Sequence, residues 1–298
     1  MVCEGGRCRD ATVCDIVAPN LTGTWDMHST LRLREALPSW LSSFLDGIAG
    51  PLRFLSGAAT CIDFGLSPSI ETAICDLVRP YVDEFLPPWA PPVFDAIASL
   101  NDVLNTWEID ETMTLTAGGV PDSYRGTHTW ERVSFTYRDR PLMGDPTTVF
   151  DWRFAPNAFN ANVVCGVFNI DRHSVHVSLG SIVSWLVDAL VYETTDHRYS
   201  SLAEALTALS AGFCDGLARA AESSISASVG DTVRRVCTST IAGLITSAVR
   251  EVLDARIGAD PITLRGFANI GGPNSLVMGH WDGTLIGSDF TGDWQAVR

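Results

Sequence analysis

A stretch of sixteen residues near the N-terminus recurs later in the chain and limits the folds that this sequence can adopt. The first copy, from Asp26 to Leu41, is DMHSTLRLREALPSWL, and the second, from Asp171 to Leu186, is DRHSVHVSLGSIVSWL. In both copies an alternating polar and apolar pattern, typical of a strand, is followed by the three- and four-residue spacing of a helix. We therefore expect one strand–helix unit to occur twice.

Later motifs support a tandem duplication because they recur in the same order. The segment 113–115 precedes a pair of glycines at 118–119, and the similar segment 262–264 precedes a pair at 271–272. Such glycines between alternating segments are typical of hairpin turns. The predicted fold class is α+β, a tandem duplication of a strand–helices–β-meander unit with helices packed on an antiparallel sheet. We expect a Cys-rich lead segment at 1–20, a first repeat at 21–157 and a second repeat at 158–298, the two repeats forming one compact body.

The alternation and the helical spacing also place individual elements. Between residues 23 and 34 the apolar or small residues alternate strictly with polar ones, which predicts a half-buried strand. From Leu37 to Ile48 apolar residues follow helical spacing, which predicts an amphipathic helix. Further helices are expected at about 68–87, 92–106, 182–190, 200–222 and 226–256, and further strands at about 108–116, 126–137, 147–154 and 163–179.

The composition excludes two classes of protein. The chain has 298 residues, is 46% hydrophobic and carries a formal charge of −15, with every one of its 20 basic residues an arginine. A nucleic-acid partner would require clustered basic residues, so we expect none. No apolar run is long enough to span a membrane, so we expect no transmembrane segment. The absence of lysine is typical of a high-GC genome.

The eight cysteines favour disulfide bonds over a metal site. Their spacing contains no C-x-x-C and no His/Cys pattern suited to zinc. We predict two disulfides within the helical segments, Cys61–Cys75 and Cys214–Cys237, each contributing about 2–4 kcal/mol. The partners of the other cysteines stay open: Cys3, Cys8, Cys14 and Cys165. An oxidising, extracytoplasmic location follows, and the N-terminus, which lacks the features of a signal peptide, suggests a mature secreted fragment.

No motif in the sequence predicts catalysis, a metal or a cofactor. His28-Ser29 and His173-Ser174 resemble parts of a hydrolase site, but neighbouring residues of a strand point to opposite faces. The histidines show no H-E-x-x-H spacing, and no phosphate-binding glycine loop is present. A metal site would have to draw on His28, His128, His173, His176 or His280 with nearby aspartates. We therefore expect a protein that is not an enzyme.

The chain resembles the exported lipoproteins of unknown function from high-GC predatory and gliding Gram-negative bacteria. The resemblance rests on Gly23-x-Trp25 at the start of a strand, on Leu37-Pro38 at the start of a helix, and on the closing Gly-Asp-Trp-x-Ala-x-Arg of residues 292–298. It implies a lipid anchor upstream of this chain and an envelope location, and it implies no activity. A fainter likeness to tubular lipid-binding folds comes from the pairing of helices with a curved sheet in two copies.

Three functions remain open from the sequence. The first is an exported cell-envelope protein that is not catalytic and binds a lipid or another apolar small molecule between helices and sheet. Its candidate ligand-lining residues are Trp40, Phe44, Trp185 and Leu186. The second is a structural or interaction module of the cell surface. The third is a secreted hydrolase, which would have to combine residues of both repeats, for example His28 with Ser174.

Overall fold

The computed structural model describes residues 2–4, 7–9, 19–34, 36–37, 86–142, 157–177, 179–224, 226–239, 243 and 260–298. The strand expected at 147–154 lies outside these residues, and so do the helices expected at 37–48 and 68–87 apart from residues 37, 86 and 87. Trp40, Phe44 and the predicted Cys61–Cys75 disulfide also lie outside the described residues.

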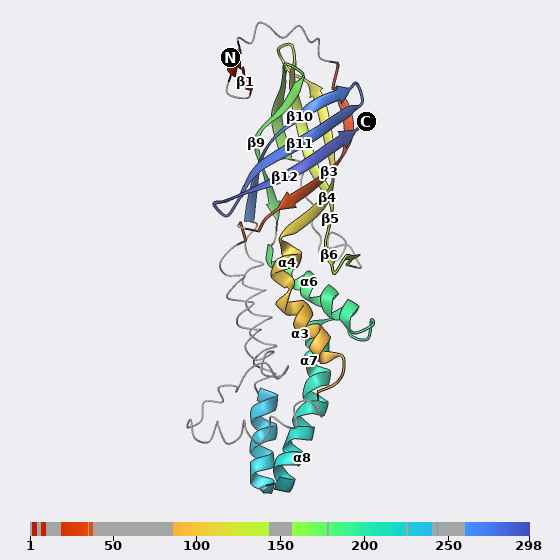
Figure 1. The fold of residues 1–298 in the computed structure, drawn as a ribbon, viewed down its shortest axis with the longest axis vertical. Coiled ribbons are helices and arrows are strands. Elements are labelled where there is room, and N and C mark those ends of the chain that lie inside the picture. Colours follow the sequence, from red (N-terminus) through yellow and green to blue (C-terminus); the bar gives the residue numbers. More distant parts are fainter. Residues whose placement is uncertain are drawn as a thin grey trace.

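Eight antiparallel strands close into a barrel, which occupies the upper half of Figure 1. In the order around the barrel, each strand pairs with the next and the last, β9, pairs with the first, β10. The strands in that order are β10 (Asp260–Gly272), β11 (Ser275–Leu285), β12 (Ser288–Val297), β3 (Gly23–Arg32), β4 (Thr106–Ala117), β5 (Ser123–Ser134), β8 (Asn157–Val164) and β9 (Val167–Val177). Two short hairpins lie outside the barrel: β1 (Val2–Glu4) with β2 (Arg7–Arg9), and β6 (Thr136–Tyr137) with β7 (Arg140–Pro141).

The predicted α+β fold with helices packed on a sheet is therefore wrong. A sheet with one apolar face needs a cover for that face, and the helices were expected to provide it. In the structure the sheet covers its own apolar face by closing on itself. The helices instead form an arm that extends from one end of the barrel (Figure 1). The order of one barrel strand, a helical segment and three further barrel strands does occur twice, beginning with β3 and with β9. The expected boundaries at 20/21 and 157/158 stay predictions.

The arm contains helices from two segments of the chain, the one between β3 and β4 and the one between β9 and β10. The first contributes α3 (Ala90–Ala98) and α4 (Leu100–Leu104), and α3 contacts α6 (Leu179–Thr194) of the second. After α6, helix α7 (Leu202–Leu209) continues through a π-helical turn (Ser210–Cys214) into α8 (Asp215–Ser224). A further helix spans 227–239. Among the described helices, none is long and apolar enough to cross a membrane.

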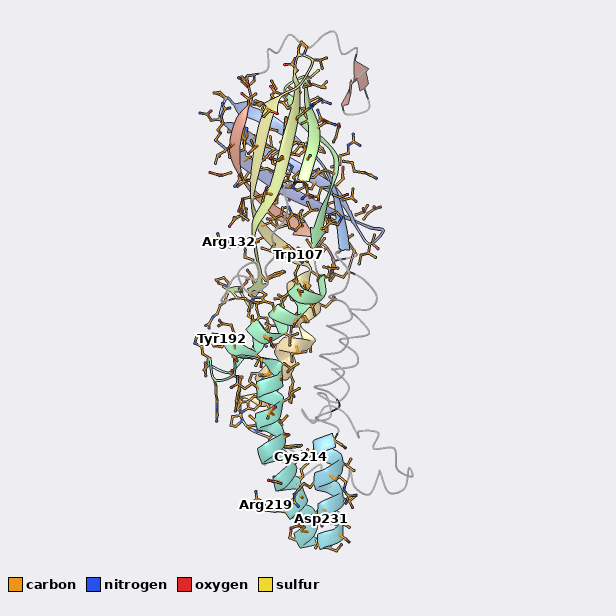
Figure 2. The ribbon with its side chains drawn as sticks, turned by 180° about the vertical axis from the view of Figure 1, so that it is seen from behind. Trp107, Arg132, Tyr192, Cys214, Arg219 and Asp231 are labelled. Carbon is orange, nitrogen blue, oxygen red and sulfur yellow. A yellow bond between two sulfur atoms is a disulfide. The ribbon has the colours of Figure 1, made fainter. Side chains whose placement is uncertain are left out.

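The predicted Cys214–Cys237 disulfide is confirmed. It joins the α7–α8 helix to the helix at 227–239, with the two Cα atoms 5.6 Å apart. Figure 2 shows Cys214 far down the arm, whereas Trp107 lies where the barrel meets the arm. Cys165 is also disulfide-bonded, and none of the described cysteines is free.

The predicted strand at 23–34 and the hairpin around Gly118-Gly119 are confirmed as β3 and as the β4–β5 pair. In β3 the alternation of buried and exposed side chains follows the sequence pattern, with Trp25, Met27, Ser29 and Leu31 pointing into the barrel. The helix expected at 182–190 is confirmed as part of α6. The barrel interior is thus the place where most of the strand-borne apolar residues lie.

Large side chains lying over glycines fill the barrel interior. A Cβ atom on Gly266 would lie 2.3 Å from the ring of Trp281, and one on Gly126 would lie 2.2 Å from the ring of Phe159. The same relation holds for Gly283 with Phe290 and for Gly279 with Trp294. An eight-stranded barrel is just wide enough for its own side chains to fill. The glycines therefore create the space that the neighbouring rings occupy.

Replacing Gly266 with alanine should destabilise the protein, because the ring of Trp281 is buried and cannot move away freely. We expect the free energy of unfolding to fall by about 1–3 kcal/mol, as for other overpacked cores. Denaturant titration of Gly266→Ala would measure this. Gly119→Ala is the matched control, since no atom lies within 4 Å of its added Cβ. An equal loss of stability in both variants would contradict the proposed packing.

Candidate functional site

Two of the predicted ligand-lining residues lie in the core between barrel and arm. Trp185 and Leu186 are buried on α6. The ring of Trp185 lies 6.0 Å from that of Phe135, which lies 5.7 Å from that of Trp107. This aromatic series lies where the barrel meets the arm, at the position of Trp107 in Figure 2. Neither Trp185 nor Leu186 lines either of the two described pockets, and their ligand-lining role stays a prediction.

The structure does not bring His28 and Ser174 together. Both side chains point away from the barrel interior, and they come from strands β3 and β9. Three strands separate β3 from β9 in either direction around the barrel. Within the pair His28-Ser29, His28 is exposed and Ser29 is fully buried, as expected for neighbours on a strand. The hydrolase hypothesis therefore loses the pair of residues proposed for it.

A polar network lies inside the otherwise apolar barrel. It consists of Glu111 from β4, His128 from β5 and His173 from β9, all three buried. The His128 Nε2 atom contacts the Glu111 carboxylate, and the His128 Nδ1 atom lies 2.8 Å from His173 Nε2. The ring of Trp281 stacks on that of His128 at 5.7 Å, and its Nε1–H donates a hydrogen bond of 2.9 Å to Ser29 Oγ.

The hydrogen-bond partners determine how the protons are arranged in this network. The carbonyl oxygen of Asp171 can only accept, so His173 donates to it from Nδ1 over 3.2 Å. A neutral His173 then accepts at Nε2 from His128 Nδ1–H. This leaves one proton to be shared between His128 and Glu111. Wherever that proton lies, the three side chains together carry no net charge, which is the condition under which such groups can be buried.

A β-bulge in β9 turns His173 toward the interior. Ile170 pairs with Gly266 and His173 pairs with Leu264, so Asp171 and Arg172 together oppose one residue of β10. Asp171 and Arg172 are both exposed, whereas Ile170 and His173 are both buried. Burial, aided by the nearby His128, lowers the pKa of His173 to about 4. The imidazole is therefore kept neutral inside the barrel at neutral pH.

The three side chains of the network are shielded from solvent. Its members are buried behind the barrel wall, and neither described pocket includes them. Within the described parts of the chain, no three His, Cys, Asp or Glu side chains are arranged to hold a metal ion. The two described pockets lie instead on the outside of the barrel.

The outer face of β10, β11, β12 and β3 carries two neighbouring hollows. These strands lie side by side on the near side of the barrel in Figure 1. The hollow closer to the arm, which we call the arginine pocket, has a volume of about 520 Å³. Its lining residues are Arg32, Arg34, Arg172, Thr263, Arg265, Asp282, Gly283, Thr284, Asp289, Phe290 and Thr291.

The strand register explains how arginines distant in sequence meet in this pocket. Arg265 pairs with Asp282, Asp282 pairs with Thr291, and Thr291 pairs with Arg32. The bulge in β9 adds Arg172 at the other end of this row, next to Arg265. Cross-strand neighbours lie about 5 Å apart, so long arginine side chains from separated strands can reach a common ligand.

The charge of the arginine pocket is opposite to that of the whole chain. It contains four arginines and two aspartates, whereas the chain has a formal charge of −15. Of the four arginines, only Arg32 forms an ion pair with another described residue, Asp293, at 2.5 Å, and Arg34, Arg172 and Arg265 form none. The hydrogen bond from Arg32 is the main cause that lowers the pKa of Asp293. Three guanidinium groups are thus available to an anion.

The second hollow, which we call the apolar hollow, continues the arginine pocket along the same strands. Its volume is about 750 Å³. It is lined by His28, Thr30, Phe267, Met278, Gly279, His280, Asp293, Trp294 and Gln295. Phe267 is 43% exposed and Met278 is 74% exposed, and both are among the few large apolar side chains that reach solvent within the described residues. The ring of Phe267 lies 5.4 Å from that of His280.

A comparison with protein-family models, with curated proteins and with solved structures finds no match for this chain.

Neither the buried network nor the arginine cluster was predicted from the sequence, although His128 and His173 were named as candidates for a metal site and the network left a signal. Glu111 is spaced by two residues from Ile109 and Met113, so the alternation places a carboxylate on the apolar face of its strand. His128 has the same relation to Trp130. A charged or titratable residue in an apolar stripe is a recognisable signal. The arginines carry no such signal, because only the pairing of β9, β10 and β3 within one barrel brings them together.

Stability should depend on pH through His173. Its pKa is about 4 in the folded protein and about 6.5 in the unfolded chain, so the unfolded state binds a proton more readily. The stabilising contribution is complete above pH 6.5 and is lost as pH falls toward 4, in total about 3 kcal/mol.

Urea titrations of the wild type and of His173→Asn between pH 8 and pH 4.5 would test this. The amide can still accept from His128 and donate to Asp171 but does not titrate in this range. We expect the wild type to lose more stability than the variant as pH falls from 8 to 4.5, because only the wild type contains the titrating imidazole. Parallel curves would contradict the assignment.

Proposed function

We propose that this protein is a non-catalytic binding protein of the cell envelope that holds an anionic ligand in the arginine pocket. The observation that carries the proposal is the gathering of Arg32, Arg34, Arg172 and Arg265 in one hollow of a strongly acidic chain. Arginines repel one another when no anion lies between them, so a cluster of this kind suits a ligand with negative charge.

The chemistry of the pocket suits an oxyanion, either a phosphate or a carboxylate. A guanidinium group presents its N–H donors in a planar fork that matches two oxygens of such a group. The hydroxyl groups of Thr263, Thr284 and Thr291 can add neutral hydrogen bonds. Asp282 and Asp289 repel an anion, and they limit the site to ligands that reach at least two of the arginines.

The envelope location is supported by the disulfide bonds. Cys214–Cys237 and the disulfide of Cys165 would persist in an oxidising compartment and would be reduced in most cytosols. The resemblance to exported lipoproteins points in the same direction. The apolar ligand expected between helices and sheet is not part of this proposal, because the helices do not cover a face of the sheet.

Isothermal titration calorimetry with inorganic phosphate and with acetate, at low ionic strength, tests the proposal. We expect saturable binding of at least one of them, weakening as salt is added. Arg265→Ser should weaken that binding about tenfold or more, since a hydrogen bond to a charged group contributes about 1.5–3 kcal/mol.

Arg125→Ser is the matched control. Arg125 is an exposed arginine on β5, outside both described pockets, and its loss changes the net charge by the same amount. We expect its affinity to stay within about twofold of the wild type, as for other screened surface charges. The proposal is overturned if neither phosphate nor acetate binds saturably, or if both variants weaken the binding equally.

A further inference from the structure

We propose that the ligand is an anionic amphiphile, with its phosphate or carboxylate head in the arginine pocket and its apolar body in the apolar hollow. This inference rests on the proposed function, because it assigns the head group to the same arginines.

The two hollows follow one another along the same strands. On β10 the outward side chains run from Arg265 in the pocket to Phe267 in the hollow, which are two residues apart. On β12 they run from Thr291 in the pocket to Gln295 in the hollow. At 3.3 Å per residue this last step covers about 13 Å, enough for a short extended chain. A single molecule can therefore reach from one hollow into the other.

The backbone at Met278 is shaped to expose its side chain. Strand β11 contains a β-bulge here. Leu276 pairs with Ala296 and Gly279 pairs with Trp294, so two residues of β11 lie opposite one residue of β12. Met278 has a φ of 50°, in the left-handed region that residues with a side chain rarely adopt. A strained backbone that presents an apolar side chain to solvent is costly unless that side chain has a partner. Methionine is well suited to contact flexible apolar ligands.

The other described positions of this kind have a local explanation. Ile286 also has a positive φ and is exposed, but it lies in the β11–β12 hairpin turn, where such angles are required. Met278 lies within a strand, so no turn accounts for it. With Phe267 beside the same hollow, it gives the apolar body a surface to cover.

The two hollows are of the size expected for a small ligand. Volumes of about 520 and 750 Å³ both fall within the usual range for ligand sites. The ion pair between Arg32 of the pocket and Asp293 of the hollow lies at their junction. Asp293 places a negative charge next to the hollow, which disfavours a second anionic group there and so fixes the direction of the ligand.

Calorimetric titration with a series of soluble alkyl phosphates, from ethyl to octyl and below the concentration at which they form micelles, tests this inference. We expect the affinity to rise about twofold to fourfold with each methylene group that is buried. It should level off once the chain extends past Met278. Arg265→Ser should weaken binding of every member of the series.

Met278→Gly and Phe267→Ser should flatten the dependence on chain length. The glycine also removes the unfavourable φ, so thermal unfolding should show that this variant is not destabilised enough to explain the loss. Val120→Ser is the matched control: Val120 is 66% exposed, lies outside both described pockets, and should leave the series unchanged.

The outcomes separate this inference from the proposed function. If inorganic phosphate binds but alkyl chains add no affinity in the wild type, the amphiphile is excluded and the anion-binding function stands. If neither inorganic phosphate, acetate nor any alkyl phosphate binds, both fail. Binding to vesicles of anionic phospholipid without binding to soluble octyl phosphate would also overturn the inference, because the ligand would then be a surface and not a single molecule.

Discussion

Closure of the sheet into a barrel is the constraint on which the rest of the structure depends. Side chains alternate along every strand, so closure sorts them into an interior set and an exterior set. The interior set is mostly apolar and aromatic and is packed over glycines such as Gly266. Closure also leaves none of the eight strands with an unpaired edge, so the barrel needs no helix to protect it. The helices are then free to form an arm at one end.

The same sorting separates two kinds of polar chemistry. Inside, Glu111, His128 and His173 can be buried only as a neutral, fully hydrogen-bonded group. Outside, Arg34, Arg172 and Arg265 of the pocket remain in contact with water and keep their charge without an ion-pair partner among the described residues. The first arrangement contributes to a unique, pH-dependent fold, whereas the second can exchange water for a ligand. The candidate site is therefore assigned to the outer face because solvent and ligands can reach the side chains there.

Local features of the fold could be predicted from the sequence, and distant pairings could not. The alternation in β3, the helical spacing in α6 and the glycine pair of the β4–β5 turn are visible within short windows. The sequence also places one cysteine in each of two successive predicted helices, and Cys214 is joined to Cys237 in the structure. The turn at Cys165-Gly166 between β8 and β9 was missed, because cysteine with a φ of 54° is an unusual first residue for such a turn. Closure depends on β12 pairing with β3 across the whole length of the chain, for which no local pattern exists.

The two copies of Asp-x-His-Ser are alike in sequence, but a one-residue change in register gives their histidines and serines opposite orientations in the barrel. In the first copy His28 points outward and Ser29 inward, whereas in the second His173 points inward and Ser174 outward. The bulge at Asp171 and Arg172 contributes to this, since it places two successive side chains on the outside. If the side chains instead alternated strictly from Ile170 onward, with no bulge, Arg172 would point into the apolar interior and the pocket would lose one of its guanidinium groups. One backbone irregularity thus directs Arg172 to the candidate ligand site and His173 to the buried network, so the interior and the outer face constrain each other at this point.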